Sequence, residues 1–137
     1  GLAIHHSFRS YVATVIDVEV QGKNIKVHDA YVVLDCGTHI NPDTCVAQME
    51  GAVVFGLSLA LKSEITFDKG SAVQGNLDTY ELLRMMESPR VTVDLVQSEA
   101  LPAGVGEPGV PPVAPALTNA IFAASGQRIR KLPVSLA

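Results

Sequence analysis

The stretch with the clearest chemical character runs from Leu101 to Pro112, where three glycines and four prolines surround one carboxylate, Glu107. Gly104 and Gly106 have no Cβ, so their backbone allows a bulky ligand to come close. Pro108 restricts Glu107 to an extended conformation. One reactive group on so constrained a backbone is typical of a catalytic loop, although a connector with an exposed glutamate can have the same composition.

A second candidate is Gln48, in the sequence Gln48-Met-Glu-Gly. Its side-chain amide can both donate and accept hydrogen bonds. On a helix, Gly51 lies one turn further on and would leave space beside Gln48 for a ligand. Taken alone, the same pattern also describes an exposed helix position beside a tight helix contact.

The residue types that commonly bind metals are too scattered to predict a protein-ligated metal site. Two adjacent histidines, His5 and His6, would point to opposite faces of a strand. The two cysteines, Cys36 and Cys45, do not form a CxxC pair, and we expect both to be buried free thiols rather than a disulfide. Neither a GxSxG nucleophile elbow nor a phosphate-binding glycine fingerprint is present.

Alternating apolar residues predict two antiparallel strands before these motifs. The first covers Tyr11–Val20, and the second covers Ile25–Cys36. Residues 21–24 form a turn in which Gly22 and Asn24 tolerate positive φ. The apolar phase shifts within the second strand, which predicts a β-bulge near Asp29.

A helix is predicted to begin at Asn41-Pro42-Asp43, with Asn41 as its cap. Apolar side chains then recur at helical spacing: Val46, Met49, Val53, Leu57 and Leu61. Two glycines inside this helix, Gly51 and Gly56, each cost about 1 kcal/mol relative to alanine. We therefore expect something to approach the helix backbone closely at these positions.

Further strands are predicted over Ser63–Phe67 and Val91–Gln97, with an unassigned stretch between them. A second helix is predicted over Pro111–Ser125, with Gly126 as a left-handed stop. Together, these elements predict an α+β fold of antiparallel β-hairpins packed by two main helices. We expect residues 1–137 to form a single domain.

The composition limits the classes of partner. Apolar residues make up 47% of the chain and charged residues only 18%, so part of its outside is expected to be buried against a larger subunit or a partner chain. The net charge of −4 and the absence of a long basic run argue against nucleic-acid binding. The longest apolar run, Ala52–Leu61, is about half the length of a membrane span, and no signal peptide is expected in this chain.

Three blocks of sequence resemble the xanthine dehydrogenase and aldehyde oxidase family. They are Asp35-Cys-Gly with Asn41-Pro-Asp-Thr, Gln48-Met-Glu-Gly-Ala and Gly56-Leu; Asn76, Tyr80 and Leu83-Arg84; and Gly104-Val-Gly-Glu-Pro-Gly-Val-Pro-Pro through Val113-Ala-Pro-Ala to Asn119-Ala-Ile-Phe-Ala-Ala. The similarity runs from about Gly1 to Pro133 and is greatest to the isoquinoline 1-oxidoreductase branch. It implies the C-terminal segment of a molybdopterin-binding large (beta) subunit.

The resemblance also implies a cofactor and a set of site residues. The cofactor is molybdenum held by molybdopterin, in its cytosine dinucleotide form, without a direct metal ligand from the protein. Glu107 matches the catalytic general base. Gln48, Gly104, Val105 and Gly106 match cofactor-binding positions.

The implied reaction is hydroxylation of an N-heterocycle or an aldehyde with oxygen derived from water. Electrons would leave through two [2Fe–2S] clusters on a separate iron–sulfur small subunit. The other partners implied are the remainder of the large subunit and a small-molecule substrate, and the isolated chain is expected to be inactive. The alternative is a stand-alone structural or partner-binding domain without activity; a cytoplasmic and a periplasmic location both remain open.

Overall fold

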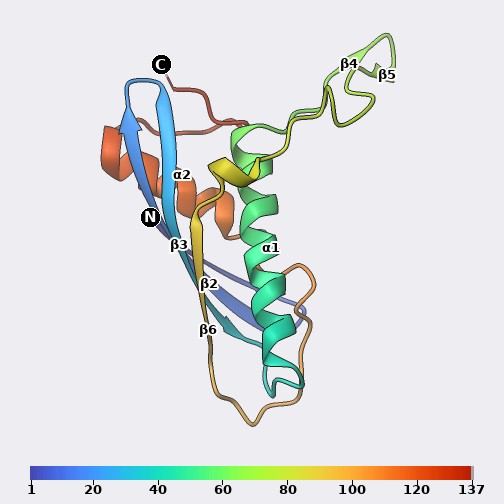
Figure 1. Cartoon of the computed structure of the whole chain (residues 1–137), viewed down its shortest axis with the longest axis vertical. Helices are drawn as coiled ribbons and strands as arrows, with labels where there is room; N and C mark the ends of the chain where they lie inside the picture. Colours follow the sequence, from blue (N-terminus) through green and yellow to red (C-terminus); the bar gives the residue numbers. More distant parts are fainter. Residues whose placement is uncertain (137) are drawn as a thin grey trace.

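The computed structural model describes residues 1–136 and consists of one four-stranded sheet packed against two helices (Figure 1). The predicted domain of residues 1–137 extends to residue 137, which lies outside the described residues. The sheet has the order β1-β2-β3-β6, and its strands are β1 (Leu2–Ser7), β2 (Ser10–Gln21), β3 (Asn24–Asp35) and β6 (Arg90–Leu95). The helices are α1 (Pro42–Leu61) and α2 (Val113–Ser125).

The predicted α+β class is confirmed. The two predicted strands pair as the antiparallel hairpin β2–β3, and β1 adds a further antiparallel strand. β6, which matches the predicted strand at Val91–Gln97, pairs with β3 in parallel, so the sheet is mixed. Neither β1 nor the parallel pairing was predicted, since both depend on contacts between distant parts of the chain.

The β-bulge lies where the sequence indicated it. Asp17 pairs with Asp29, but Val18 pairs with Val27, which leaves His28 as the extra residue on β3. This shift keeps both Val27 and Ala30 buried on the same side of the sheet. In the turn that joins β2 to β3, Gly22 has a positive φ of +59, as expected. Asn24 does not have a positive φ.

The start of α1 and the end of α2 lie where the sequence predicted them. The Asn41 side chain accepts a hydrogen bond from the Thr44 backbone N–H at 3.1 Å, and Pro42 occupies the first helical position. Gly126 ends α2 in the left-handed conformation, with φ +73. α1 packs against α2, β3 and β6, while α2 packs against β1 and β2, so the two helices share the inner face of the sheet.

The core lies between that inner face and the helices. It includes Val12, Ile16, Val32, Leu34, Met49, Val53, Leu57, Leu117 and Ile121. The outer face of the sheet stays open and exposes several apolar side chains: Leu2, Ile4, Val15, Tyr31 and Val33. The two cysteines are free and buried, as predicted.

The prediction of a strand over Ser63–Phe67 is wrong. The chain instead leaves the body after α1 as an arm of residues 63–84, which projects outward and carries only the short hairpin of β4 (Phe67–Asp68) and β5 (Ser71–Ala72) (Figure 1). The extended residues before β4 have no neighbouring strand in the main sheet to pair with. The arm returns to the body at the 3-10 helix η1 (Met85–Glu87).

Helix α1 has 20 residues and a mean hydropathy of 1.5 over an 18-residue window, so by length and composition alone it could cross a membrane. The sequence prediction considered only the run Ala52–Leu61, which is too short to cross a membrane. The side of α1 that carries Met49, Val53 and Leu57 is buried in the core, as in the core helix of a folded domain. The absence of a membrane span stays a prediction.

Candidate functional site

The segment before Glu107 is fixed to the sheet through its backbone. The Ala103 N–H donates to the Cys36 carbonyl at 2.9 Å, and the Gly104 N–H donates to the Phe8 carbonyl at 3.1 Å. The buried Ser10 hydroxyl donates to the Gly104 carbonyl at 2.7 Å. These three bonds connect the loop to the end of β3 and to the β1–β2 turn, so its path over the body is determined before it reaches Glu107.

The turn that follows Glu107 is seated on helix α1. The Val110 N–H donates to the Glu107 carbonyl at 3.0 Å, which closes a tight turn with Pro108 and Gly109 at its centre. A Cβ on Gly109 would lie 2.7 Å from the Ala52 Cβ and 2.9 Å from the Met49 Sδ. The absence of that Cβ allows the turn to contact α1 directly.

Gln48 joins the loop to α1 from the other side. Its Nε2 donates to the Gly106 carbonyl at 3.3 Å and, more weakly, to the Val105 carbonyl at 3.5 Å. The side-chain oxygen makes no hydrogen bond among the described residues, so it can accept one from a ligand. The predicted residues Gln48, Val105, Gly106 and Glu107 therefore meet at one place, between α1 and the loop.

A hollow of about 420 Å³ lies at this place, and both Gln48 and Glu107 line it. Its other lining residues are mostly small or apolar: Gly51, Ala52, Phe55, Gly106, Val110 and Pro111. A Cβ on Gly51 or Gly106 would meet no atom of the chain within 4 Å. The hollow therefore combines one carboxylate and one amide with two open glycine surfaces.

The predicted glycines do not behave alike. Gly106 faces open space, but a Cβ on Gly104 would lie 2.8 Å from the Cβ of Phe8. In this chain the missing side chain of Gly104 makes room for Phe8, so the expected open approach there is not found. Val105 is half-buried and packs against the core, so only its carbonyl faces Gln48.

The two glycines inside helix α1 also differ in what lies beside them. The expected close approach is found at Gly56, where a Cβ would lie 2.6 Å from the Val113 Cβ of α2. At Gly51 no part of the chain approaches. Gly109 and Phe55 are among the residues of the site that the sequence did not single out, although Phe55 lies on the same helix face as Gln48 and Gly51, seven and four residues further on.

The titratable groups near the loop differ in environment. Glu107 and Gln48 are exposed in this chain. Burial raises the pKa of the Cys36 thiol to about 11, with a further contribution from the neighbouring Cys45. Cys36 is therefore protonated at neutral pH and contributes to the site through its carbonyl, which accepts the bond from Ala103. Among residues 1–136, no group of three or more His, Cys, Asp or Glu side chains is placed to hold a metal ion.

Comparisons with known proteins show the family of this chain. Residues 4–89 match the molybdopterin cofactor-binding domain family. The chain is 35% identical over 136 residues to the isoquinoline 1-oxidoreductase subunit beta of Brevundimonas diminuta, covering 98% of this chain and 17% of that protein. It is also 42% identical over 103 residues to a protein of Gluconacetobacter polyoxogenes named membrane-bound aldehyde dehydrogenase [pyrroloquinoline-quinone], covering 75% and 13%.

Solved structures share the fold. Quinoline 2-oxidoreductase from Pseudomonas putida 86 superposes with a TM-score of 0.77 at 22% identity, over 90% of this chain and 17% of that chain. The aldehyde oxidoreductase from Desulfovibrio gigas superposes with a TM-score of 0.76 at 23% identity, over 90% and 14%. The chain thus spans about a sixth of the length of these proteins. It belongs to the molybdopterin cofactor-binding domain family of the molybdenum hydroxylases.

Proposed function

We propose that this chain forms one wall of the molybdenum site in a hydroxylase that oxidises an aldehyde or an N-heterocycle, with Glu107 as the general base. The observation that carries the proposal is that Glu107 and Gln48, 59 residues apart in sequence, line one hollow. The relatives' names support the substrate classes, since they include aldehyde, isoquinoline and nicotinate enzymes. The family match ends at residue 89, so the role of Glu107 rests on the site itself.

The residues of the hollow fit a bulky cofactor. Gly51 and Gly106 leave their surfaces open, and the free oxygen of the Gln48 amide can accept a hydrogen bond from a pterin N–H. Gly104 and Val105 belong to the same proposed cofactor-binding segment through their backbone. When bound, molybdopterin, for which we propose the cytosine dinucleotide form, would supply a metal that accepts an electron pair from the substrate.

Glu107 would act as the proton acceptor in this reaction. Its carboxylate would take the proton from the water-derived oxygen as that oxygen bonds to an electron-poor carbon of the substrate. The C–H bond of that carbon would break, and its hydrogen and electron pair would pass to the cofactor. The hydrogen bonds at Gly104 and the close contact of Gly109 with α1 fix the backbone on both sides of Glu107. The carboxylate therefore needs little reorganisation to accept the proton. A positioned base of this kind accelerates a reaction by a factor of about 10² to 10⁴.

The partners in this proposal are the remainder of a large subunit and an iron–sulfur small subunit that carries two [2Fe–2S] clusters. The exposed apolar side chains on the outer face of the sheet, such as Ile4 at 68% exposure, provide a surface that the remainder of the subunit would cover. The 137-residue chain alone is expected to be inactive, because it spans about a sixth of its relatives.

The decisive experiment compares Glu107→Gln with Glu99→Gln in the complete enzyme. We expect Glu107→Gln to lose activity by a factor of about 10² to 10⁴ with its cofactor retained. Glu99 is an exposed carboxylate earlier in the same segment, so Glu99→Gln should keep full activity. Normal turnover by Glu107→Gln would refute the assignment of the base.

Metal analysis and pterin release test the cofactor independently of the base. Molybdenum with a pterin cytosine nucleotide is the expected result. Pyrroloquinoline quinone in its place would support the cofactor in the name of the Gluconacetobacter relative. The absence of both cofactors from an intact protein would favour the alternative, a structural or partner-binding domain.

A further inference from the structure

The part of the body around the C-terminal end of α1 has an unusual charge. Two contiguous hollows there share the residues Leu61 and Val134 and measure about 560 and 480 Å³. They are lined by six of the ten basic residues of the chain: Lys23, Lys26, Lys62, Arg128, Arg130 and Lys131. Only two of its fourteen acidic residues, Glu64 and Glu87, line them. A chain with a net charge of −4 thus has one markedly basic end.

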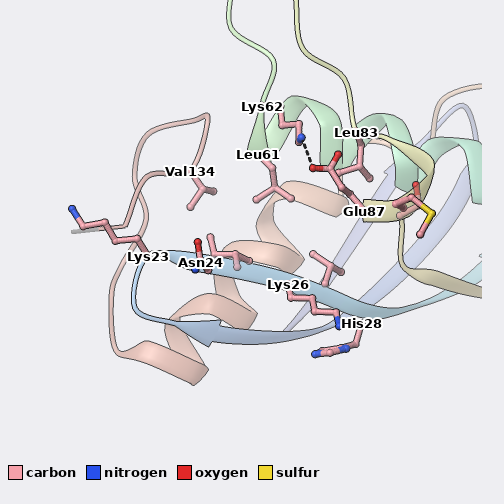
Figure 2. A pocket seen from close by; sticks show the side chains of 13 residues that line it. Lys23, Asn24, Lys26, His28, Leu61, Lys62, Leu83, Glu87 and Val134 are labelled. Atoms are coloured by element: carbon pink, nitrogen blue, oxygen red, sulfur yellow. Dashed lines mark hydrogen bonds and ion pairs between the residues drawn. The ribbon is translucent and has the colours of Figure 1, made fainter.

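Three of these six cations are available to a partner. Arg128 lies over the Phe122 ring at 3.5 Å, and Lys26 lies opposite Glu19 in the β2–β3 pair. Lys62 is neutralised by Glu87, whose carboxylate lies 2.6 Å from its Nζ and whose pKa is lowered by this contact (Figure 2). Within residues 1–136, no ion pair is formed by Lys23, Arg130 or Lys131, and all three side chains are exposed.

The floor between the cations is apolar. Figure 2 shows Leu61 from α1, Leu83 from the end of the arm and Val134 from the C-terminal segment around one hollow. Ile25 and Val27 of β3 also line it. The Val134 N–H donates to the Ala60 carbonyl at 2.8 Å, which holds the C-terminal segment against the end of α1. The Leu83 N–H likewise donates to the Ser58 hydroxyl of α1 at 3.0 Å. The floor is therefore built from four separate parts of the chain, two of which are hydrogen-bonded to α1.

The arrangement of the cations indicates what can bind. A small anion needs donors that converge on one point, but Figure 2 shows the Lys23 amine pointing away from the hollow and Lys62 already bonded to Glu87. The three cations left over instead line different hollows, Lys23 the larger one and Arg130 and Lys131 the smaller one, and we call these three residues the rim. A chain with carboxylates at intervals and an apolar side chain between them matches both the rim and the floor.

We infer that this basic end is a docking surface for an acidic segment of a partner protein, with an apolar side chain of that segment seated on Leu61 and Val134. Charge complementarity selects the partner, and the apolar floor fixes its position. Gln48 and Lys62 are 14 residues apart on or next to α1, which is about 21 Å along a helix. The surface is therefore separate from the Glu107 hollow and does not depend on the function proposed for it.

The test measures binding of synthetic peptides to the protein by titration calorimetry. The probe is a glutamate-rich peptide with a central leucine. In one comparison peptide glutamine replaces every glutamate, and in the other serine replaces the leucine. We expect the probe to bind, both comparison peptides to bind more weakly, and affinity to fall as salt screens the rim charges.

Charge-reversal variants locate the binding surface. The triple variant Lys23→Glu/Arg130→Glu/Lys131→Glu is expected to bind the probe at least about tenfold more weakly, as three exposed ion pairs would be lost. Lys69→Glu on the arm is the control for a single reversal and should bind normally. Circular dichroism of each variant confirms that the fold is retained.

Four results would overturn the inference. The first is failure of the probe peptide to bind. The second is equal binding by the triple variant. The third is displacement of the peptide by inorganic phosphate alone, which would indicate a small-anion site. The fourth is a preference for phosphatidylglycerol vesicles or a single-stranded oligonucleotide over the peptide, which would assign the basic end to a membrane or a nucleic acid.

Discussion

Each of two faces of helix α1 carries one glycine and one large apolar side chain, but only the inner face packs against other parts of the chain. On the inner face Leu57 is fully buried, and Val113 of α2 occupies the space that a Cβ on Gly56 would need. On the outer face Phe55 is 51% exposed, and Gly51 has no neighbour within 4 Å of a would-be Cβ. A glycine in this helix therefore has two distinct uses: close packing within the chain on one face, and open space beside a carboxylate on the other.

The largest difference in unfolding free energy between the two faces is expected when one large side chain on each face is truncated. Leu57→Ala should cost about 2–5 kcal/mol of unfolding free energy, because it leaves a cavity in the core. Phe55→Ala removes a half-exposed ring and should cost clearly less. Urea unfolding followed by circular dichroism measures both. Equal losses would show that the outer face is also packed in solution.

Adding a methyl group to the inner glycine gives the next effect. In Gly56→Ala the new Cβ would lie 2.6 Å from the Val113 Cβ, so the two helices must separate. Overpacking of this kind costs about 1–3 kcal/mol, of which the better helix propensity of alanine returns up to about 1 kcal/mol. The net change in urea unfolding is expected to be a loss of stability.

The same change on the outer face should have the opposite sign. Gly51→Ala meets no atom, so the helix propensity of alanine should stabilise the fold by up to about 1 kcal/mol. If the proposed cofactor occupies the hollow, this variant of the complete enzyme should retain less molybdenum than the natural protein. A stable variant with full cofactor content would show that the cofactor does not approach Gly51.

The smallest expected effect concerns the ion pair at the base of the arm. The pKa of Glu87 is lowered by the hydrogen bond from Lys62. Its contribution to stability is complete above the ordinary glutamate pKa of about 4.3 and is lost as pH falls through the lowered folded-state pKa. Glu87→Gln should therefore slightly lower the melting temperature at neutral pH, less so at high salt, with no difference at strongly acid pH. An effect that persisted in acid would point to packing instead of charge.

Local signals in the sequence predicted much of the fold. The start of α1 follows from Asn41-Pro42, and the bulge at His28 follows from the shift of apolar phase in β3. The parallel pairing of β6 with β3 could not be predicted, because it joins segments separated by about 60 residues and leaves no local pattern. The strand expected over Ser63–Phe67 failed for a similar reason: its apolar residues had no strand to pair with.

The candidate site was predicted less evenly. The composition around Glu107 indicated a constrained carboxylate, and the helical pattern indicated Gln48 as a second candidate, to which the resemblance gave a cofactor-binding role; the structure places both at the same hollow. Sequence alone could not separate Gly104 from Gly106, because the difference lies in whether Phe8 packs against the glycine. It also did not indicate Gly109, whose importance appears only once Met49 and Ala52 are seen beneath it.

The arm of residues 63–84 leaves and rejoins the body at almost the same point. The Ser63 hydroxyl donates to the Glu81 carbonyl at 2.8 Å, and the Leu83 N–H donates to the Ser58 hydroxyl at 3.0 Å. The excursion is thus closed at its base, and the β4–β5 hairpin at its tip projects away from the body of the molecule (Figure 1). A fluorophore attached at that tip could therefore report on the neighbours of the protein inside an assembly without disturbing the body.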